Sequence, residues 1–155
     1  MSSIDLAVEM VAGVSHSERR AVAFLRGHPD LTAGPEFDGA STAPLGKRLK
    51  HRMGLWIAFQ PDTNGKFHRF KSDAQRYRDC FVFIDLEEQV RIYGFTCHPK
   101  KTDQRFELVL LIRWVQKKRQ NTDYGELDRV LIWKDHFATH IALRNAFPNT
   151  KVIQL

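Results

Sequence analysis

Two stretches of the chain carry apolar residues at the spacing of an α-helix. In residues 4–24 the apolar positions recur every three or four residues, with a break at Gly13, and this period predicts two short N-terminal helices. A second stretch of near-helical spacing fills residues 102–120 behind Pro99, where Thr102 or Asp103 is placed to cap a helix. We therefore expect helices on both sides of the central part of the chain.

The central part has the composition and the turn residues of β-strands. β-Branched and aromatic residues gather in short runs, and the turn sequence PDTNG and the acidic segment LEE separate neighbouring runs. The predicted strands cover residues 55–60, 66–72, 76–85 and 89–97. They indicate a twisted antiparallel sheet of four or five strands and, with N-terminal helices and a C-terminal helix around it, an α+β fold.

Two segments do not fit this pattern. Residues 27–44 are rich in Gly, Pro, Asp, Ser and Thr, a composition that favours an irregular, mobile loop. Residues 121–155 form a C-terminal extension with a short apolar run, VLIW, the helix-like HFATHIALRNAF and a last extended piece, KVIQL. We expect residues 1–155 to form a single domain, because a hydrophobic content of 43% suffices for one core of ordinary size.

The net charge favours a polyanionic partner. Lys and Arg outnumber Asp and Glu by 24 to 18, which gives a net charge of +6. The amino terminus has no basic stretch followed by an apolar one, and the longest apolar run, residues 108–112, is too short to cross a bilayer. We expect a cytoplasmic protein without a membrane partner.

The cations are concentrated where the strands are expected. Residues 66–119 hold thirteen Lys or Arg against seven Asp or Glu. Along a strand, Arg69 and Lys71 share one face, and Arg76 and Arg78 share a face of the next predicted strand. Such a surface can hold phosphates, although the same alternation also describes the solvated face of an ordinary antiparallel sheet.

The segment RFKSDAQRYRDCFVFIDLEEQVRIYGFTCHPKK resembles the catalytic half of the RelE-type messenger-RNA interferases, members of the RelE/ParE toxin superfamily. The shared features are a strand with two alternating cations, a Tyr-Arg strand, an acidic turn, and a strand that ends in Gly and a basic cluster. The upstream LGKRLKHRMGLW is similar to the basic helix and Gly-Leu-Trp of that superfamily. The RYR strand and the residues KKTD, which precede the expected last helix, are similar to those of longer relatives of the YhaV type. In all, the resemblance covers residues 45–120, about half of the chain.

Carried over by position, the resemblance implies a set of catalytic residues. The paired cations of the family's first catalytic strand fall on Arg69 and Lys71, the arginine that contacts the scissile phosphate falls on Arg78, and the basic residue after the last strand falls on Lys100, with His98 beside it. The residues implied to bind RNA are Lys66, Arg76, Lys101, Arg105 and Phe106.

One position departs from the family. Its tyrosine near the start of the last helix falls on Phe106, or near Arg105 if the register differs. The ring of Phe106 keeps the ability to stack on a base, but it has no hydroxyl for a hydrogen bond or a proton transfer.

The resemblance implies cleavage of messenger RNA without a metal or another cofactor. When the ribose 2′-hydroxyl attacks the adjacent phosphate, fixed Arg and Lys donors stabilise the developing negative charge. Either Lys71, crowded by Arg69 and Arg78, or His98 accepts the proton. The chain would then be a toxin that cuts mRNA on the ribosome and is bound by a small antitoxin protein. Two alternatives are a ParE-like inhibitor of DNA gyrase and a nucleic-acid-binding module without chemistry.

Other chemistry has less support in the sequence. Cys80 and Cys97 lack CxxC spacing and lie in apolar runs, which indicates buried free thiols rather than a zinc site or a disulfide. His136 and His140 stand four apart on an expected helix but have no evident third metal ligand. Tyr77 is expected in the core.

Overall fold

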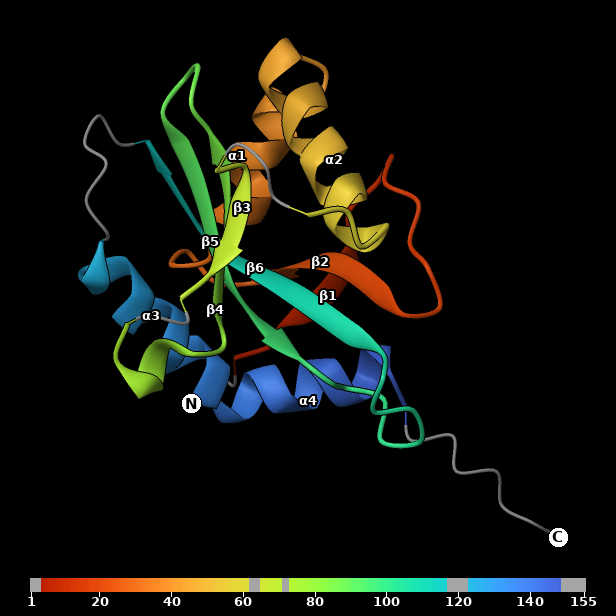
Figure 1. The fold of residues 1–155 in the computed structure, drawn as a ribbon. Coiled ribbons are helices and arrows are strands. Elements are labelled where there is room, and N and C mark those ends of the chain that lie inside the picture. The colour runs from red at the N-terminus through yellow and green to blue at the C-terminus, as the bar shows by residue number, and fades with distance from the viewer. Residues whose placement is uncertain (1–3, 62–64, 71–72, 117–122, 149–155) are drawn as a thin grey trace, which may run out of the picture.

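The computed structural model describes residues 4–61, 65–70, 73–116 and 123–148. The strands in this part of the chain form one six-stranded sheet in the order β1-β2-β6-β5-β4-β3 (Figure 1). Their bounds are β1 Ala7–Met10, β2 Arg20–Arg26, β3 Phe67–Arg69, β4 Cys80–Asp85, β5 Val90–Cys97 and β6 Glu107–Gln116. β2 and β6 pair in parallel and the other neighbours are antiparallel. The sheet is therefore mixed, whereas the sequence predicted a purely antiparallel one.

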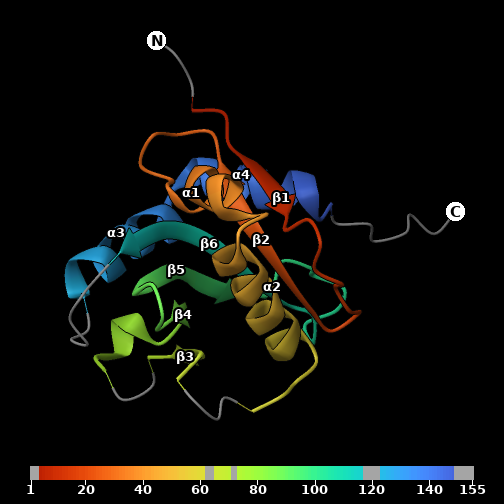
Figure 2. The ribbon, with the colours of Figure 1, turned by 90° about the horizontal axis from the view of Figure 1, so that it is seen from above.

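Helices cover both faces of this sheet. They are α1 Ala33–Ala40, α2 Pro44–Ile57, α3 Tyr124–Asp135 and α4 Phe137–Ala146, and a 3-10 turn, η1, spans Gln75–Tyr77. The two helices α1 and α2 pack on one face, and α3 and α4 pack on the other; Figure 2 shows α2 and α3 on opposite sides of the strands. The chain is thus α+β, but its layout differs from the predicted one because helices lie between the strands and cover both sheet faces.

Each buried strand sends alternate side chains into two separate cores. In β6, Leu108 and Leu110 pack beneath α3 and α4, while Val109 and Leu111 pack beneath α1 and α2. β2 divides its side chains in the same way. Because both faces are covered, these strands read as continuous apolar runs, and the alternation that marks a half-exposed strand is lost.

This loss of alternation explains two wrong predictions. Residues 4–24, expected to form two helices, instead form β1 and β2, and Gly13 lies with a φ of 80° in the segment between them. Residues 102–120, expected to form a helix, contain β6. In β2 and β6 a helix period was read into a run that is buried on both sides, whereas β1 is a mostly exposed strand at the edge of the sheet.

The α1–α2 region also differs from the prediction. Residues 27–44, expected to be irregular, contain α1, which is held by Phe37 packing on Phe24 with ring centroids 5.2 Å apart. Two glycines and a proline make α1 a weak helix by propensity, so tertiary packing decides its structure. Residues 55–57, predicted to begin a strand, are the last turn of α2.

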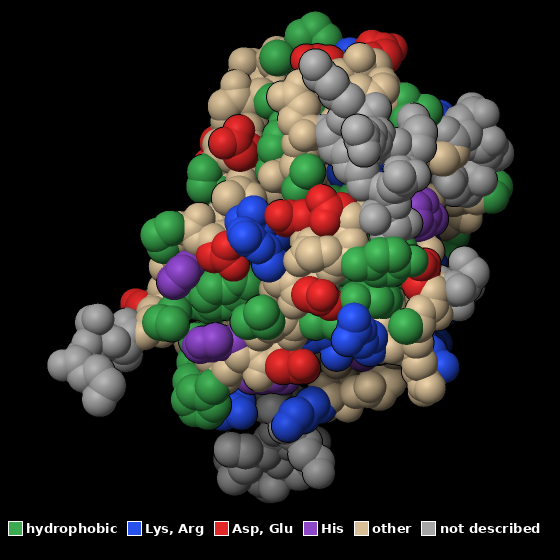
Figure 3. Space-filling view, turned by 90° about the vertical axis from the view of Figure 1, so that its left-hand side faces the viewer, with side chains coloured by type: hydrophobic (Ala, Val, Ile, Leu, Met, Phe, Trp, Pro, Cys, Tyr) green, Lys and Arg blue, Asp and Glu red, His purple; other side chains and the backbone are tan. Residues whose placement is uncertain are grey.

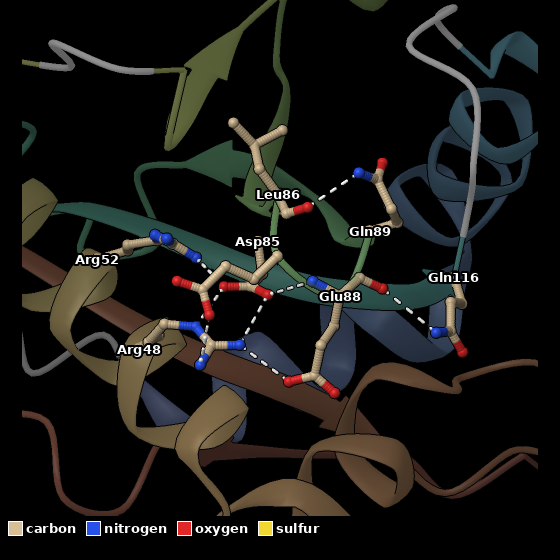
Figure 4. Close-up of polar contacts among 8 residues, drawn as sticks. Arg48, Arg52, Asp85, Leu86, Glu88, Gln89 and Gln116 are labelled. Carbon is tan, nitrogen blue, oxygen red and sulfur yellow. Dashed lines mark hydrogen bonds and ion pairs between the residues drawn. The ribbon is translucent and has the colours of Figure 1, made fainter.

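One carboxylate joins α2 to the turn between β4 and β5 (Figure 4). The side chain of Asp85 is fully buried and accepts hydrogen bonds from Arg48 Nε at 2.8 Å and Arg52 Nη1 at 2.5 Å. The backbone N–H of Glu88 donates to the same carboxylate at 3.0 Å. The two arginines lie four apart on one face of α2, so a single buried acid fixes the helix against the sheet.

The prediction of three successive antiparallel strands in residues 66–97 is confirmed in its main point. β3, β4 and β5 are three neighbouring antiparallel strands, with Phe67 opposite Phe83 and Phe81 opposite Gly94. The strand predicted from residue 76 begins only at Cys80, because residues 75–77 form η1. The helix-like C-terminal segment forms α4. Among the described helices, none combines the length and hydrophobicity that spanning a bilayer would take.

Candidate functional site

A cleft of about 740 Å³ lies between the end of β5 and helix α4. We call it the β5–α4 cleft. Its basic and histidine side chains come from β3, from the segment between β5 and β6, and from helices α3 and α4: Arg69, His98, Lys101, Lys134, His140 and Arg144. Three carboxylates also line it: Asp79, Glu107 and Asp135. The fold thus brings cations and histidines together from residues far apart in the sequence.

His98 follows the last residue of β5 and has a defined orientation. Its Nδ1 lies 3.0 Å from the backbone carbonyl oxygen of Phe106. A carbonyl oxygen only accepts, so Nδ1 carries the hydrogen, and in the neutral ring Nε2 is left with the lone pair. The exposed imidazole therefore has one nitrogen held by the backbone and one available for a proton.

Arg69 is held at the edge of the cleft by two partners. Its guanidinium donates to Thr96 Oγ1 at 3.1 Å and to a Glu107 carboxylate oxygen at 2.5 Å. Glu107 also faces Arg20, whose Nε lies 3.6 Å from it. Two cations consequently share one acid, which leaves positive charge at this edge of the cleft.

Helix α4 supplies a side of the cleft that the sequence prediction missed. His140, Leu143, Arg144 and Phe147 all line it, at the spacing of one helix face. The residues HFATHIALRNAF show this spacing, but only the packing of α4 reveals that the face is turned toward the end of β5. His136 has a different role, because its Nδ1 accepts from the Ala138 backbone N–H at 3.0 Å and caps the helix.

Several residues implied by the resemblance lie elsewhere. Phe106 is buried, 3% exposed, against Phe147, and Lys100 Nζ lies 4.0 Å from its ring centroid. The ring of Phe106 therefore offers no open face to a base. Lys100 itself is turned toward this ring and does not line the cleft.

The remaining implied cations are scattered. Arg76 donates to the Tyr77 hydroxyl at 2.6 Å, and that hydroxyl donates to Asp128 at 2.7 Å. Tyr77 is buried, 2% exposed, as predicted. Arg76 lies in η1 and Arg78 follows it, so the strand face that these two residues were predicted to share is wrong, and Arg78 does not line the cleft.

Three further positions complete the implied set. Arg105 is exposed, with its Nε 3.5 Å from a carboxylate oxygen of Asp103. Lys66 directly precedes β3 and does not line the cleft. Lys71 lies outside the described residues.

The cysteines and histidines make no redox or metal centre in this part of the chain. Cys80 and Cys97 are free, and burial raises the pKa of each thiol to about 12. Both stay protonated at neutral pH, so Cys97 lines the cleft without being a nucleophile. No group of three or more His, Cys, Asp or Glu in the described ranges could hold a metal ion.

The charge of the chain is not gathered into one basic patch on the face that carries α3. Figure 3 shows Lys and Arg side chains there beside Asp and Glu, with histidine and hydrophobic side chains between them. A ligand of that face would meet both signs of charge, which favours the cleft as the place where cations converge.

Comparisons with known proteins identify no relative. No family model matches the chain, and searches of curated proteins and of solved structures find no match either.

Proposed function

We propose that this chain is an endoribonuclease toxin of the RelE/ParE type and that the β5–α4 cleft is where it cleaves messenger RNA. One observation carries the proposal. Two histidines, His98 and His140, line the same cleft as Arg69, Lys101 and Arg144. Histidines and fixed cations are the groups that metal-independent cleavage of RNA needs.

The reaction can be written with these side chains alone. The ribose 2′-oxygen forms a bond to the adjacent phosphorus and gives its proton to Nε2 of His98. The bond from phosphorus to the 5′-oxygen breaks, and that oxygen takes a proton from His140. Arg69 and Arg144 stabilise the charge on the phosphate oxygens. The products are a 2′,3′-cyclic phosphate and a 5′-hydroxyl, and no further reactant is consumed.

The resemblance supports this assignment in two places. The basic segment LGKRLKHRMGLW lies within α2, and the strands after it follow in the order β3, β4, β5 as antiparallel neighbours. The last helix that the resemblance implied near Phe106 is strand β6 instead, and the parallel pair of β2 with β6 and the helices α3 and α4 were not implied by it. Messenger RNA on the ribosome is the substrate and a small antitoxin the protein partner, as the resemblance implies; orientation by the ribosome would supply part of the rate.

The test compares two histidines that have the same local geometry. His68 Nδ1 also lies near a backbone carbonyl oxygen, that of Arg69 at 2.8 Å, but His68 does not line the cleft. We expect His98→Gln to slow mRNA cleavage on translating ribosomes by roughly 10²- to 10⁴-fold, and His68→Gln to leave it unchanged. Mapping the 5′ ends of cut mRNA over time measures both rates. Equal rates for His98→Gln and the native chain would remove His98 from the mechanism.

A second candidate is a nucleic-acid-binding module without chemistry. The acids of the cleft favour this candidate, because they occupy cations that cleavage would need for stabilising charge on the phosphate. Glu107 pairs with Arg69, and Asp79 lies 3.8 Å from Lys134. Such a module would bind RNA and cut none with or without ribosomes. Induction of the chain in cells separates both candidates from a gyrase inhibitor. New mRNA ends with an early stop of translation support the endoribonuclease, whereas an early stop of DNA synthesis with altered supercoiling supports gyrase inhibition.

A further inference from the structure

Phe59 has a backbone conformation that is unusual for its side chain. It follows the end of α2 with a φ of 61°, in the left-handed region where helix ends normally place Gly. The N–H of Phe59 donates to the Trp56 carbonyl at 3.0 Å, and the N–H of Gln60 donates to the Leu55 carbonyl at 2.9 Å. These two bonds close the helix end in the pattern that requires this φ. A phenylalanine here costs stability that Gly would not.

The ring of Phe59 is exposed instead of being packed in a core. Its exposed fraction is 54%. Arg20 lies against the ring, with Cζ 3.8 Å from the centroid, and Arg19 Cζ lies 6.0 Å from it. Arg20 is itself fixed, because Nη1 donates to the Trp56 carbonyl at 2.6 Å and its Cζ lies 4.4 Å from the Trp56 ring. One face of Phe59 is thus backed by a rigid cation, and its exposure leaves the ring open to a ligand.

A chain of ionic contacts joins Phe59 to the β5–α4 cleft. Arg20 faces Glu107, and Glu107 binds Arg69, which lines the cleft. In Figure 1 the C-terminal end of α2 and the first residues of β2 and β6 lie on the same side of the molecule. An RNA strand with one phosphate in the cleft could extend past Arg69 and Arg20 and bring a neighbouring base to the exposed ring of Phe59.

We propose that Phe59 is a stacking platform for one base of single-stranded RNA, with Arg19 and Arg20 beside the phosphates of that nucleotide; this rests on the proposed function of the cleft. Unpaired bases bind proteins by stacking on aromatic rings and arginines. A net charge of +6 and the two flanking arginines favour a polyanion as the ligand of this ring. The contact would hold RNA without taking part in its cleavage.

The experiment measures binding separately from cleavage. The probe is a short fluorescein-labelled oligoribonucleotide with 2′-O-methyl groups, which lacks the attacking hydroxyl, and affinity is read by fluorescence anisotropy. We expect Phe59→Ala to weaken binding about tenfold, within the range that loss of one stacked base produces. Phe59→Trp, which has the same backbone requirement and keeps an aromatic face, should bind as the native chain does.

Phe137→Ala is the matched control. Phe137 is 76% exposed but does not line the cleft, and we expect its removal to leave affinity unchanged. Equal binding by the native chain and Phe59→Ala would overturn the stacking role and leave the cleft proposal intact. Weak binding by Phe59→Trp, as by Phe59→Ala, would also overturn it. No binding by the native chain would overturn both proposals.

Discussion

Asp85 is a buried residue that remains charged. Burial by itself raises the pKa of its carboxyl, but hydrogen bonds from Arg48, from Arg52 and from the Glu88 N–H outweigh burial and lower that pKa to about 2. The two arginines are therefore committed to the fold, and their charges are neutralised where α2 meets the sheet. In the sequence, Arg48 and Arg52 are simply two cations of a basic segment. The structure shows that they stabilise the fold, unlike the cations that line the cleft.

We expect Asp85→Asn to lower the free energy of unfolding at pH 7 by about 3 kcal/mol, because it leaves Arg52 without its acid and Arg48 with only the exposed Glu87 and Glu88. The pKa of Asp85 is lower in the folded chain than in the unfolded chain. Its contribution is therefore fully present above about pH 4 and is lost as the pH falls through about 2. Urea denaturation at several pH values measures this: between about pH 4 and 2 the free energy of unfolding should fall less for Asp85→Asn than for the native chain.

The control for Asp85 is Glu87→Gln. Glu87 contacts the same Arg48, at 3.1 Å, but its side chain is 71% exposed, so we expect a loss below about 1 kcal/mol. A loss as large for Glu87→Gln as for Asp85→Asn would show that burial is not what makes the Asp85 contact strong.

Among the elements, those bounded by clear turn residues or marked by a helical period were predictable from sequence, and the doubly buried β6 was not. β5 was predicted almost to its ends, since turn residues bound it, and α4 was recognisable from its spacing. β6 was taken for a helix because Leu108 to Ile112 are all apolar and enter two cores in alternation. Of the residues that line the cleft, Arg69, His98 and Lys101 were implied by the family resemblance. Lys134, His140 and Arg144 depend on how α3 and α4 pack, which no local pattern encodes.

Helix α2 contains two glycines whose replacement by alanine should have opposite effects. A Cβ on Gly46 would lie 2.1 Å from the Ala40 carbonyl oxygen, a backbone atom that cannot rotate away, whereas a Cβ on Gly54 meets nothing within 4 Å. We expect Gly46→Ala to destabilise the chain by about 1–3 kcal/mol and Gly54→Ala to stabilise it by up to about 1 kcal/mol. Thermal and urea unfolding measure both. Two shifts of the same sign would mean that α1 and α2 are not packed as closely as described.

At the scale of the whole molecule, cations paired with acids lie on both faces of the sheet, and the β5–α4 cleft also holds cations without an acidic partner among the described residues. Many cations near α1 and α2 are paired with acids, as Arg26 is with Asp38 and Arg48 is with Asp85. On the other face, Arg144 and Lys101 line the cleft, and no ion pair within the described ranges holds either side chain. Under the proposed function, the net charge of +6 would attract RNA to the molecule in general, while the packing of α4 would determine where RNA is held.

This division predicts which cations govern the salt dependence of RNA binding. A side chain that contacts a phosphate releases counterions, so its removal lowers the slope of log affinity against log salt concentration by about 0.7 for a single strand. We expect that reduction for Arg144→Ala and for Lys101→Ala. Lys47→Ala is the control, because Lys47 is an exposed cation on α2, across the sheet from the cleft; its slope should equal that of the native chain. Affinity for the 2′-O-methyl oligoribonucleotide at several salt concentrations measures all three. If Lys47→Ala reduces the slope and Arg144→Ala does not, the RNA lies over α2, and the β5–α4 cleft is not the place where this chain holds it.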